Sequence, residues 1–184
     1  MNIGHVAVLA GTSRHFAEPT IASESLALGK LLSLTSYEVA CAGINSGPLG
    51  EFLAGFSVAA RRATAVVLDT PHEVGQIHPT LMRIVKVASI EMRKFSLFDR
   101  ATACIVLPGG LGTLDEIIWL LQEESKRMPV ILVNVNDYFT PLMRFLESMA
   151  STQLVKASRL AALHVAQTSA AAVLALEQQS ATRG

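Results

Sequence analysis

Short, wholly apolar runs of strand length alternate along this chain with segments of helix length, and this alternation is what most constrains the fold. Strands that are apolar on both faces are typical of parallel sheets covered by helices on both sides. Strands that alternate with helices also need crossover connections, which again indicate a parallel sheet. The sequence therefore predicts an α/β fold with a Rossmann-like, doubly wound parallel sheet. The predicted strands are His5–Ala10, Tyr37–Ala42, Thr64–Asp69, a weaker Ile84–Val87, Ala103–Leu107, Val130–Val135 and Leu163–Ala166.

The segments between these strands have the apolar spacing of helices. The predicted helices are Pro19–Ser33, Glu51–Arg61, about Ser89–Asp99, Gly112–Lys126, Thr140–Met149 and Ser169–Gln178. We expect a loop at His72–Pro79, a polar stretch at Ala150–Ser158 and a frayed tail at Gln179–Gly184. Because 184 residues suit one domain and no internal repeat is evident, we interpret residues 1–184 as a single Rossmann-like nucleotide-binding domain.

Composition argues against several classes of protein. Hydrophobic residues make up 51% of the chain and charged residues 16%, which is a poor match for a disordered protein. Lys plus Arg and Asp plus Glu number 15 each, so the basic footprint of a nucleic-acid binder is missing. The first residues do not resemble a signal peptide, and no apolar run reaches the ~20 residues of a membrane span. We therefore expect a cytoplasmic protein with no nucleic-acid or membrane partner.

The two cysteines, Cys41 and Cys104, lie in apolar runs that are predicted to be buried strands. Two cysteines cannot build a disulfide framework, and no metal-binding spacing such as CxxC occurs. We interpret both as buried, reduced thiols.

Ligands of doubly wound sheets bind outside the carboxyl ends of the strands. This rule selects three loops of the predicted fold: residues 11–14, 43–50 and 108–113. Glycine, serine and asparagine in the first two loops are candidates for contacts with phosphate or ribose. These candidates are Gly11, Ser13, Asn45, Ser46 and Gly47.

The third loop joins the clearest predicted strand to the clearest predicted helix. Its glycines allow a ligand to approach the backbone closely, and the helix that follows offers free N–H groups and a positive dipole end. Together these features predict a phosphate site, although the pattern is neither GxGxxG nor a Walker A motif. The residues expected to form it are Gly109, Gly110, Leu111, Gly112 and Thr113.

Glu116 follows this loop and has two interpretations. Residues 113–116 fit the S/T-x-x-E capping box, in which Glu116 would only cap the helix with Thr113. A cap does not require two adjacent glycines, however, and a carboxylate at the rim of a phosphate site would repel phosphate. A position so close to an anion therefore also suggests a chemical role.

These residues resemble a known family. The segment PGGLGTLDE, Pro108–Glu116, is similar to the PGGxGTxxE signature of lonely-guy type phosphoribohydrolases, once labelled lysine decarboxylases. Arg93 and Lys94 fall where that family has an Arg-Lys helix motif, and the turn at residues 11–13 resembles its Gly-Ser-Ser turn. The resemblance extends from about Val6 to Leu174. No motif identifies a lysine that would hold pyridoxal phosphate, so the older label has no chemical support.

The resemblance implies hydrolysis of the N-glycosidic bond of a nucleoside 5′-monophosphate, giving free base and ribose 5-phosphate. AMP and N6-modified AMP, the cytokinin precursor, are the substrates it implies first. It also implies that Arg93 and Glu116 are the catalytic pair and that Lys94 contacts the nucleotide. It implies no metal and no organic cofactor, and a homodimer is typical. Without the resemblance, Arg93 is equally well interpreted as a solvated helix residue.

One loop departs from the family pattern. Where the family reads GGGxxGLMG, residues 42–50 read AGINSGPLG. Ala42 and Ile44 replace glycines, and Pro48 stiffens the loop. A β-branched residue at position 44 stands where close backbone approach is expected, so the identity of the base stays open.

Two other functions remain open at this point. The chain could be a non-catalytic carrier of a phosphorylated ligand, since proteins resembling molybdenum-cofactor carriers use a similar glycine loop. A weaker alternative is transfer of the sugar to an acceptor other than water. The presence of both Arg93 and Glu116 favours the hydrolase. We interpret His15, His72, His78 and His164 as ordinary histidines without metal-ligand spacing, and Trp119 as a core or interface residue.

Overall fold

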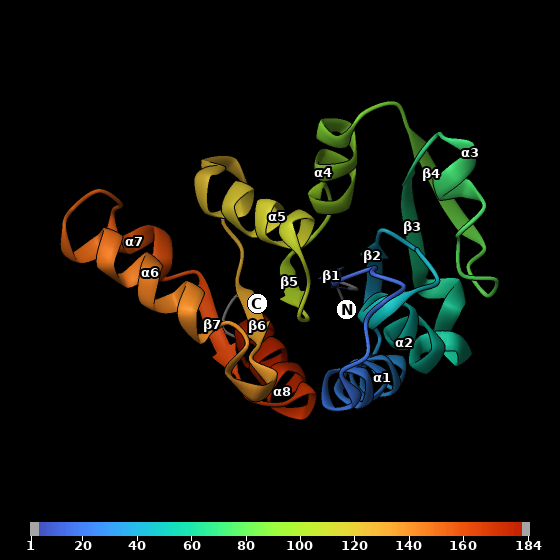
Figure 1. Cartoon of the computed structure of the whole chain (residues 1–184), viewed down its shortest axis with the longest axis horizontal. Helices are drawn as coiled ribbons and strands as arrows, with labels where there is room; N and C mark the ends of the chain where they lie inside the picture. Colours follow the sequence, from blue (N-terminus) through green and yellow to red (C-terminus); the bar gives the residue numbers. More distant parts are fainter. Residues whose placement is uncertain (1–3, 182–184) are drawn as a thin grey trace.

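A parallel sheet forms the centre of the protein. In the computed structural model, which describes residues 4–181, the strand order is β4-β3-β2-β1-β5-β6-β7, with each neighbouring pair parallel (Figure 1). The strands are β1 (His5–Leu9), β2 (Glu38–Cys41), β3 (Ala63–Leu68), β4 (Arg83–Val87), β5 (Ala103–Val106), β6 (Val130–Val133) and β7 (Leu163–Ala166). This sheet confirms the predicted Rossmann-like α/β fold.

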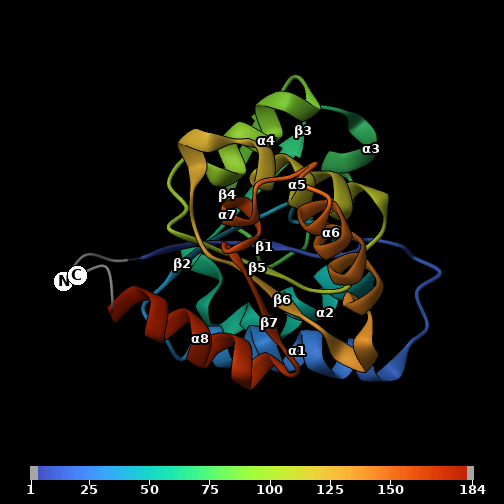
Figure 2. The same ribbon diagram turned by 90° about the vertical axis from the view of Figure 1, so that its left-hand side faces the viewer.

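Helices cover both faces of the sheet and give the molecule three layers (Figures 1 and 2). The helices α1 (Pro19–Ser33), α2 (Gly47–Phe56) and α8 (Ser169–Ala181) pack on one face. The helices α4 (Ile90–Phe98), α5 (Leu111–Gln122) and α6 (Thr140–Ser151) lie on the other. The short helices are α3 (Pro71–Val74), α7 (Ala157–Leu160) and the 3₁₀ turns η1 (Ser57–Arg62), η2 (Glu124–Lys126) and η3 (Val135–Asp137).

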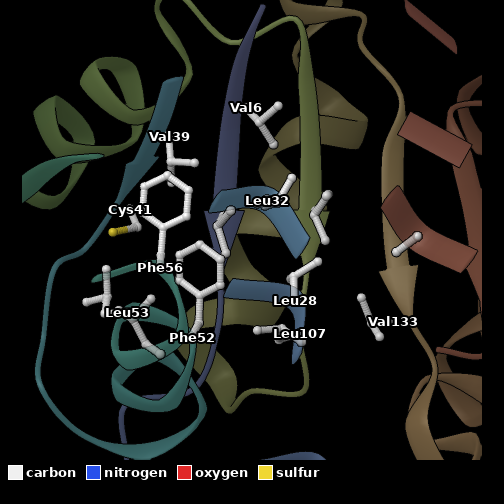
Figure 3. Packing of buried hydrophobic residues seen from close by; sticks show 14 of the residues in the cluster. Val6, Leu28, Leu32, Val39, Cys41, Phe52, Leu53, Phe56, Leu107 and Val133 are labelled. Carbon is white, nitrogen blue, oxygen red and sulfur yellow. The ribbon is translucent and has the colours of Figure 1, made fainter. Parts of the chain in front are cut away.

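Each face of the sheet has its own hydrophobic core. On the α1–α2 face, Phe52 and Phe56 stack with ring centroids 5.8 Å apart and lie close to Val39 of β2 (Figure 3). On the opposite face, Phe98 of α4 stacks on Trp119 of α5 at 5.4 Å. The central strands β1, β5 and β6 are buried almost throughout, as expected for apolar strands covered on both sides. Both cysteines are buried and free, as predicted.

Strand β4 is different because it lies at the edge of the sheet. Four of its five residues are exposed. The sequence predicted only a weak strand here, because Arg83 and Lys86 leave only the two-residue apolar run Ile84–Val85 between them. Because β4 lies at the edge of the sheet and is not covered on both sides, it can carry charged residues that a central strand could not.

Several predicted boundaries were wrong, each for a local reason. Helix α2 begins at Gly47, within the predicted loop, because Pro48 occupies a first-turn position where its missing N–H costs nothing. Helix α3 begins at Pro71 and runs into the loop predicted at 72–79, capped by the Thr70 side chain. Helix α7 forms inside the polar stretch predicted at 150–158 and extends beyond it. Helix α8 continues to Ala181, so residues 179–181 of the predicted frayed tail are helical; residues 182–184 lie outside the described part.

Candidate functional site

The order of the strands reverses between β1 and β5, and the loops that follow these two strands meet there. Register pairs run from Val6 with Ala103 to Leu9 with Val106. Beyond the strands, the Gly11 N–H donates to the Pro108 carbonyl at 3.1 Å. Crevices at such a reversal are the usual ligand sites of doubly wound sheets, so this edge of the sheet is where a site is expected.

The loop after β2 joins the other two. The Leu49 N–H donates to the Gly11 carbonyl at 3.0 Å, and the Ser46 hydroxyl donates to the Thr12 carbonyl at 2.7 Å. Gly47 has φ of +60° and packs so closely on the first loop that a Cβ would lie 2.9 Å from the Gly11 oxygen. The three predicted loops therefore form one hydrogen-bonded unit.

A cavity of about 440 Å³ opens at this unit. The loops that follow β1 and β2, helix α3 after β3, helix α4, and the glycine loop with the start of α5 contribute to its wall. The lining residues are Ala10, Gly11, Thr12, Ser13, Ala42, Ile44, Glu73, Arg93, Gly110, Gly112, Thr113 and Glu116. This cavity is the candidate functional site.

The glycines of the third loop serve two different purposes. A Cβ at Gly109 would collide with the Thr113 side chain and the Gly11 nitrogen, so Gly109 is needed for packing. By contrast, a Cβ at Gly110 or Gly112 would meet no described atom within 4 Å, although both residues line the cavity. The space above these two glycines is open to a ligand.

Helix α5 begins at this open space. Its N-cap is Gly110, whose carbonyl accepts the Leu114 N–H at 3.0 Å as the first bond of the helix. The backbone N–H groups of the helix before Leu114 therefore have no hydrogen-bond partner within the helix, as at any helix N-terminus. Such unpaired N–H groups, together with the positive end of the helix dipole, favour binding of an anion such as phosphate.

The capping-box interpretation of Glu116 is wrong. The helix starts two residues before Thr113, so Thr113 and Glu116 lie inside it and neither can serve as its N-cap. Gly110 can extend the helix in this way because the N-cap position needs an extended backbone rather than a side chain. The Glu116 side chain instead lines the cavity and is 9% exposed.

Arg93 of α4 and Glu116 of α5 both line the cavity although they come from different helices. Burial raises the pKa of Glu116 to about 7, against the opposing attraction of Arg93, and nearby Asp115 adds a smaller increase. A carboxyl group with such a pKa can both give and accept a proton near neutral pH. Perturbed carboxyl groups of this kind are common in catalytic sites.

Glu73 is a wall residue that the sequence interpretation missed. Its carboxylate lies 3.1 Å from Nη1 of Arg93, and its other oxygen accepts the Leu68 N–H at 2.8 Å. One signal could have revealed it. Thr70 and Glu73 are spaced as a T-x-x-E helix start directly after a predicted strand.

Tyr138 was also missed. Its hydroxyl donates a hydrogen bond of 2.6 Å to the Gly109 carbonyl and so braces the glycine loop from the residue that follows η3. No local pattern indicates this contact, because 29 residues separate the two positions.

Other predicted site residues lie outside this cavity. Asn45, Ser46 and Gly47 line a neighbouring cavity of about 460 Å³, which shares Ser13 with the first. The Lys94 ammonium pairs with the Asp115 carboxylate at 2.6 Å. Leu111 is 85% exposed.

The predictions for aromatic and histidine residues can be placed as well. Trp119 packs between Phe95 and Phe98 of α4, on the core side of α5, as predicted for a core or interface residue. His78 is buried, and burial lowers its pKa. Among the side chains that the structure describes, no three from His, Cys, Asp or Glu gather as a metal site would require.

A larger cavity of about 720 Å³ lies at the opposite end of the strands, where their amino ends meet. Its lining includes His5, Glu38, Thr64 and Arg83, all at or near the amino ends of strands. Because ligands of parallel sheets bind at the carboxyl ends, we assign the smaller cavity at Glu116 as the candidate site.

In the described part of the chain, no helix is both long and apolar enough to cross a membrane.

Solved structures share the overall fold. A molybdenum cofactor binding protein from Rippkaea orientalis aligns with a TM-score of 0.72 at 18% identity, covering 97% of this chain and 98% of that one. The molybdenum cofactor carrier protein from Chlamydomonas reinhardtii aligns with a TM-score of 0.71 at 19% identity, covering 98% and 99%. At these identities the likeness concerns the fold alone.

Sequence relatives point to a narrower group. A probable cytokinin riboside 5′-monophosphate phosphoribohydrolase of Oryza sativa subsp. japonica is 26% identical over 180 residues, which are 95% of this chain and 72% of that protein. A cytokinin riboside 5′-monophosphate phosphoribohydrolase of Arabidopsis thaliana is 28% identical over 135 residues, or 71% of this chain. The chain spans 61% of that second relative.

A family model described as "Possible lysine decarboxylase" matches residues 50–176. The match includes Arg93, the glycine loop and Glu116, which contribute to the lining of the candidate site. Together with the named relatives, it shows that the chain belongs to the lonely-guy family of phosphoribohydrolases, whose model bears that older description.

Proposed function

We propose that this protein hydrolyses the N-glycosidic bond of a nucleoside 5′-monophosphate, with AMP or an N6-modified AMP as the first expected substrate. The observation that carries the proposal is the shared cavity. Arg93 and Glu116 face it from two helices, beside a glycine-lined helix N-terminus that is open to a phosphate. The names of the relatives describe this activity for those proteins.

Phosphate would bind first and set the position of the sugar. The N-terminus of α5 offers unpaired backbone N–H groups beside the open space at Gly110 and Gly112. Thr113 adds a hydroxyl group at the cavity wall. With the phosphate held there, the ribose lies toward Glu116, which is one helical turn further along α5. This arrangement binds monophosphates better than nucleosides, because a nucleoside lacks the anchoring anion.

Glu116 would then act on the sugar. Cleavage of the C1′–N bond develops positive charge on the ribose, and an adjacent carboxylate stabilises it. The same carboxylate can take a proton from the attacking water, whose oxygen forms the new bond to C1′. The departing base leaves with the bonding electron pair and gains a proton from solvent, and Glu116 releases to solvent the proton that it took from the water. Ribose 5-phosphate and free base are the products.

Arg93 would act on the charged parts of the substrate. A guanidinium carries a positive charge and offers several N–H donors in a rigid, planar fork. From the cavity wall it can bind phosphate or the departing base, and its charge opposes protonation of Glu116.

The test is a panel of nucleoside monophosphates, nucleosides and triphosphates incubated with the purified protein, with free base followed by chromatography. We expect base from at least one monophosphate and at least tenfold less from its nucleoside. The Glu116→Gln variant should lose roughly 10²- to 10⁴-fold in rate, whereas Glu147→Gln, an exposed control on α6, should match the wild type.

Two outcomes would redirect the proposal. Tight binding of a monophosphate without release of any base would favour a carrier of a phosphorylated ligand. Base release from nucleosides as fast as from monophosphates would contradict the phosphate anchor. The homodimer expected from the family resemblance stays a prediction, which light scattering of the purified chain can check.

A further inference from the structure

We propose that Glu73 is a positioning residue for Arg93: the Glu73 carboxylate holds the Arg93 guanidinium at the wall of the cavity that Glu116 also lines. The inference rests on the proposed hydrolysis for its kinetic consequences. Its structural content, an Arg93 side chain fixed by Glu73, can be tested without any activity.

Glu73 is itself held firmly. One carboxylate oxygen accepts the Leu68 N–H at 2.8 Å, at the end of β3. The backbone N–H of Glu73 donates to the Thr70 hydroxyl at 3.3 Å, within the cap of α3. The carboxylate is therefore tied to the sheet, at the edge where the ligand cavity opens.

The second carboxylate oxygen of Glu73 holds Arg93. It lies 3.1 Å from Nη1, and the two side chains are only 20% and 19% exposed. By comparison, the side chains of the Lys86–Asp69 pair on the surface are 50% and 62% exposed. Partial burial weakens the competition from water, so the Glu73–Arg93 pair restricts the guanidinium more than a surface pair could.

Arg93 has few other anchors. Its Nε atom is buried and has no hydrogen-bond partner among the side chains and backbone groups that the structure describes, and among those side chains Glu73 forms an ion pair with it. A long arginine side chain without an anchor samples many rotamers. The orientation of the guanidinium toward the cavity therefore depends on Glu73.

Glu73 is poorly suited to act on the substrate directly. One Glu73 oxygen accepts the Leu68 N–H and the other accepts from Nη1 of Arg93, so both carboxylate oxygens already have partners. The pair is also nearly neutral as a whole. Glu73 thus limits the excess positive charge at the wall while leaving the remaining Arg93 donors available, which is the role of a positioning group.

The kinetic test is a double-mutant cycle with wild type, Glu73→Gln, Arg93→Ala and the double variant, each assayed on the best monophosphate. Glutamine keeps the size of the side chain, but only its amide oxygen can accept, so the two hydrogen bonds cannot both survive. We expect Glu73→Gln to lower kcat roughly 10- to 100-fold with a smaller change in KM. In the Arg93→Ala background, Glu73→Gln should lower kcat by less than about threefold, because the effects of substitutions at two coupled residues do not add.

Glu38→Gln is the matched control. Glu38 pairs with Arg83 at 3.2 Å, is 25% exposed and lies at the opposite end of the strands. The substitution removes an Arg–Glu ion pair in which the glutamate has similar exposure to Glu73 but Arg83 is 50% exposed, and it should leave kcat within twofold of wild type. An equal loss in Glu38→Gln, or an equal loss from Glu73→Gln with and without Arg93, would show a general structural effect and overturn the proposal.

The second readout does not need catalysis. In a ¹⁵N–¹H spectrum, the Nε–H signal of Arg93 is assigned by its disappearance in Arg93→Lys. We expect a signal protected from solvent exchange in the wild type and loss of that protection in Glu73→Gln, while Glu38→Gln keeps it. Unchanged protection in Glu73→Gln would overturn the inference. If the wild type releases no base, the proposed function fails, and this spectrum still decides the role of Glu73.

Discussion

Lys94 of α4 lies 2.6 Å from Asp115 of α5, and this ion pair joins the two helices that carry Arg93 and Glu116. Each partner is the immediate neighbour of a cavity residue. The pair can therefore help to hold the distance between Arg93 and Glu116 without reaching into the cavity itself.

The pair predicts a modest effect for Lys94→Gln. Asp115 is 56% exposed, so water screens the interaction and its loss should lower the free energy of unfolding by less than about 1 kcal/mol. If Lys94 only joins the helices, KM for the monophosphate should stay within about threefold of wild type. Thermal unfolding and steady-state kinetics check both points. A tenfold or larger rise in KM at unchanged stability would instead support the direct nucleotide contact predicted from the sequence.

The buried Glu116 carboxyl group should destabilise the protein above neutral pH. Its pKa is about 7 in the folded protein, compared with 4.5 for an unperturbed glutamate. Between these values the folded state binds more protons than the unfolded state, so stability falls as pH rises from about 4.5 to 7. Above that window the penalty is constant, at about 3 kcal/mol.

Glu116→Gln removes this titration. The variant should match the wild type near pH 4.5 and be more stable by up to about 3 kcal/mol at pH 8. Denaturant unfolding of both proteins at several pH values measures the difference. A stability difference that does not grow with pH would show that the Glu116 pKa is close to its ordinary value.

The same pKa predicts how activity depends on pH. If the carboxylate of Glu116 is the active form, kcat should rise with pH through a single ionisation near 7 and level off above pH 8. The second ionisation of the substrate phosphate, near pH 6, should appear mainly in KM. Measurement at saturating substrate separates the two. A kcat that falls between pH 6 and 8 would mean that the protonated form of Glu116 is the active one.

Two glycines of the same loop should respond in opposite ways to the same substitution. Gly112→Ala places its methyl group in open cavity space, so the protein should fold with an unchanged or raised Tm, since alanine favours helix. Its KM for monophosphates should rise because the methyl group occupies space above the phosphate site. Gly109→Ala would collide with Thr113 and should lower Tm clearly.

Calorimetry of both glycine variants, together with their kinetics, tests this distinction. A Gly112→Ala protein with wild-type KM would mean that the phosphate binds elsewhere, for example at the neighbouring cavity with Asn45 and Ser46.

Much of the architecture could be predicted because its causes are local. Apolar strands such as those at 103–107 and 130–135 can only be satisfied in a sheet covered on both faces, and their alternation with helices requires parallel order. The three ligand loops followed from that order. Helix ends were less predictable, since Pro48 and Gly110 each allowed a helix to start earlier than its apolar spacing indicates.

The sequence by itself thus determined the sheet and the glycine loop at its point of reversal, and through the family signature it predicted the pair Arg93 and Glu116. Tertiary structure alone decided that Glu73 meets Arg93 from 20 residues away and that Tyr138 braces Gly109. It also decided that Glu116 is buried enough to titrate near neutral pH. The physical reason is that apolar periodicity acts over neighbouring residues, whereas ion pairing and desolvation depend on which surfaces the folded chain brings together.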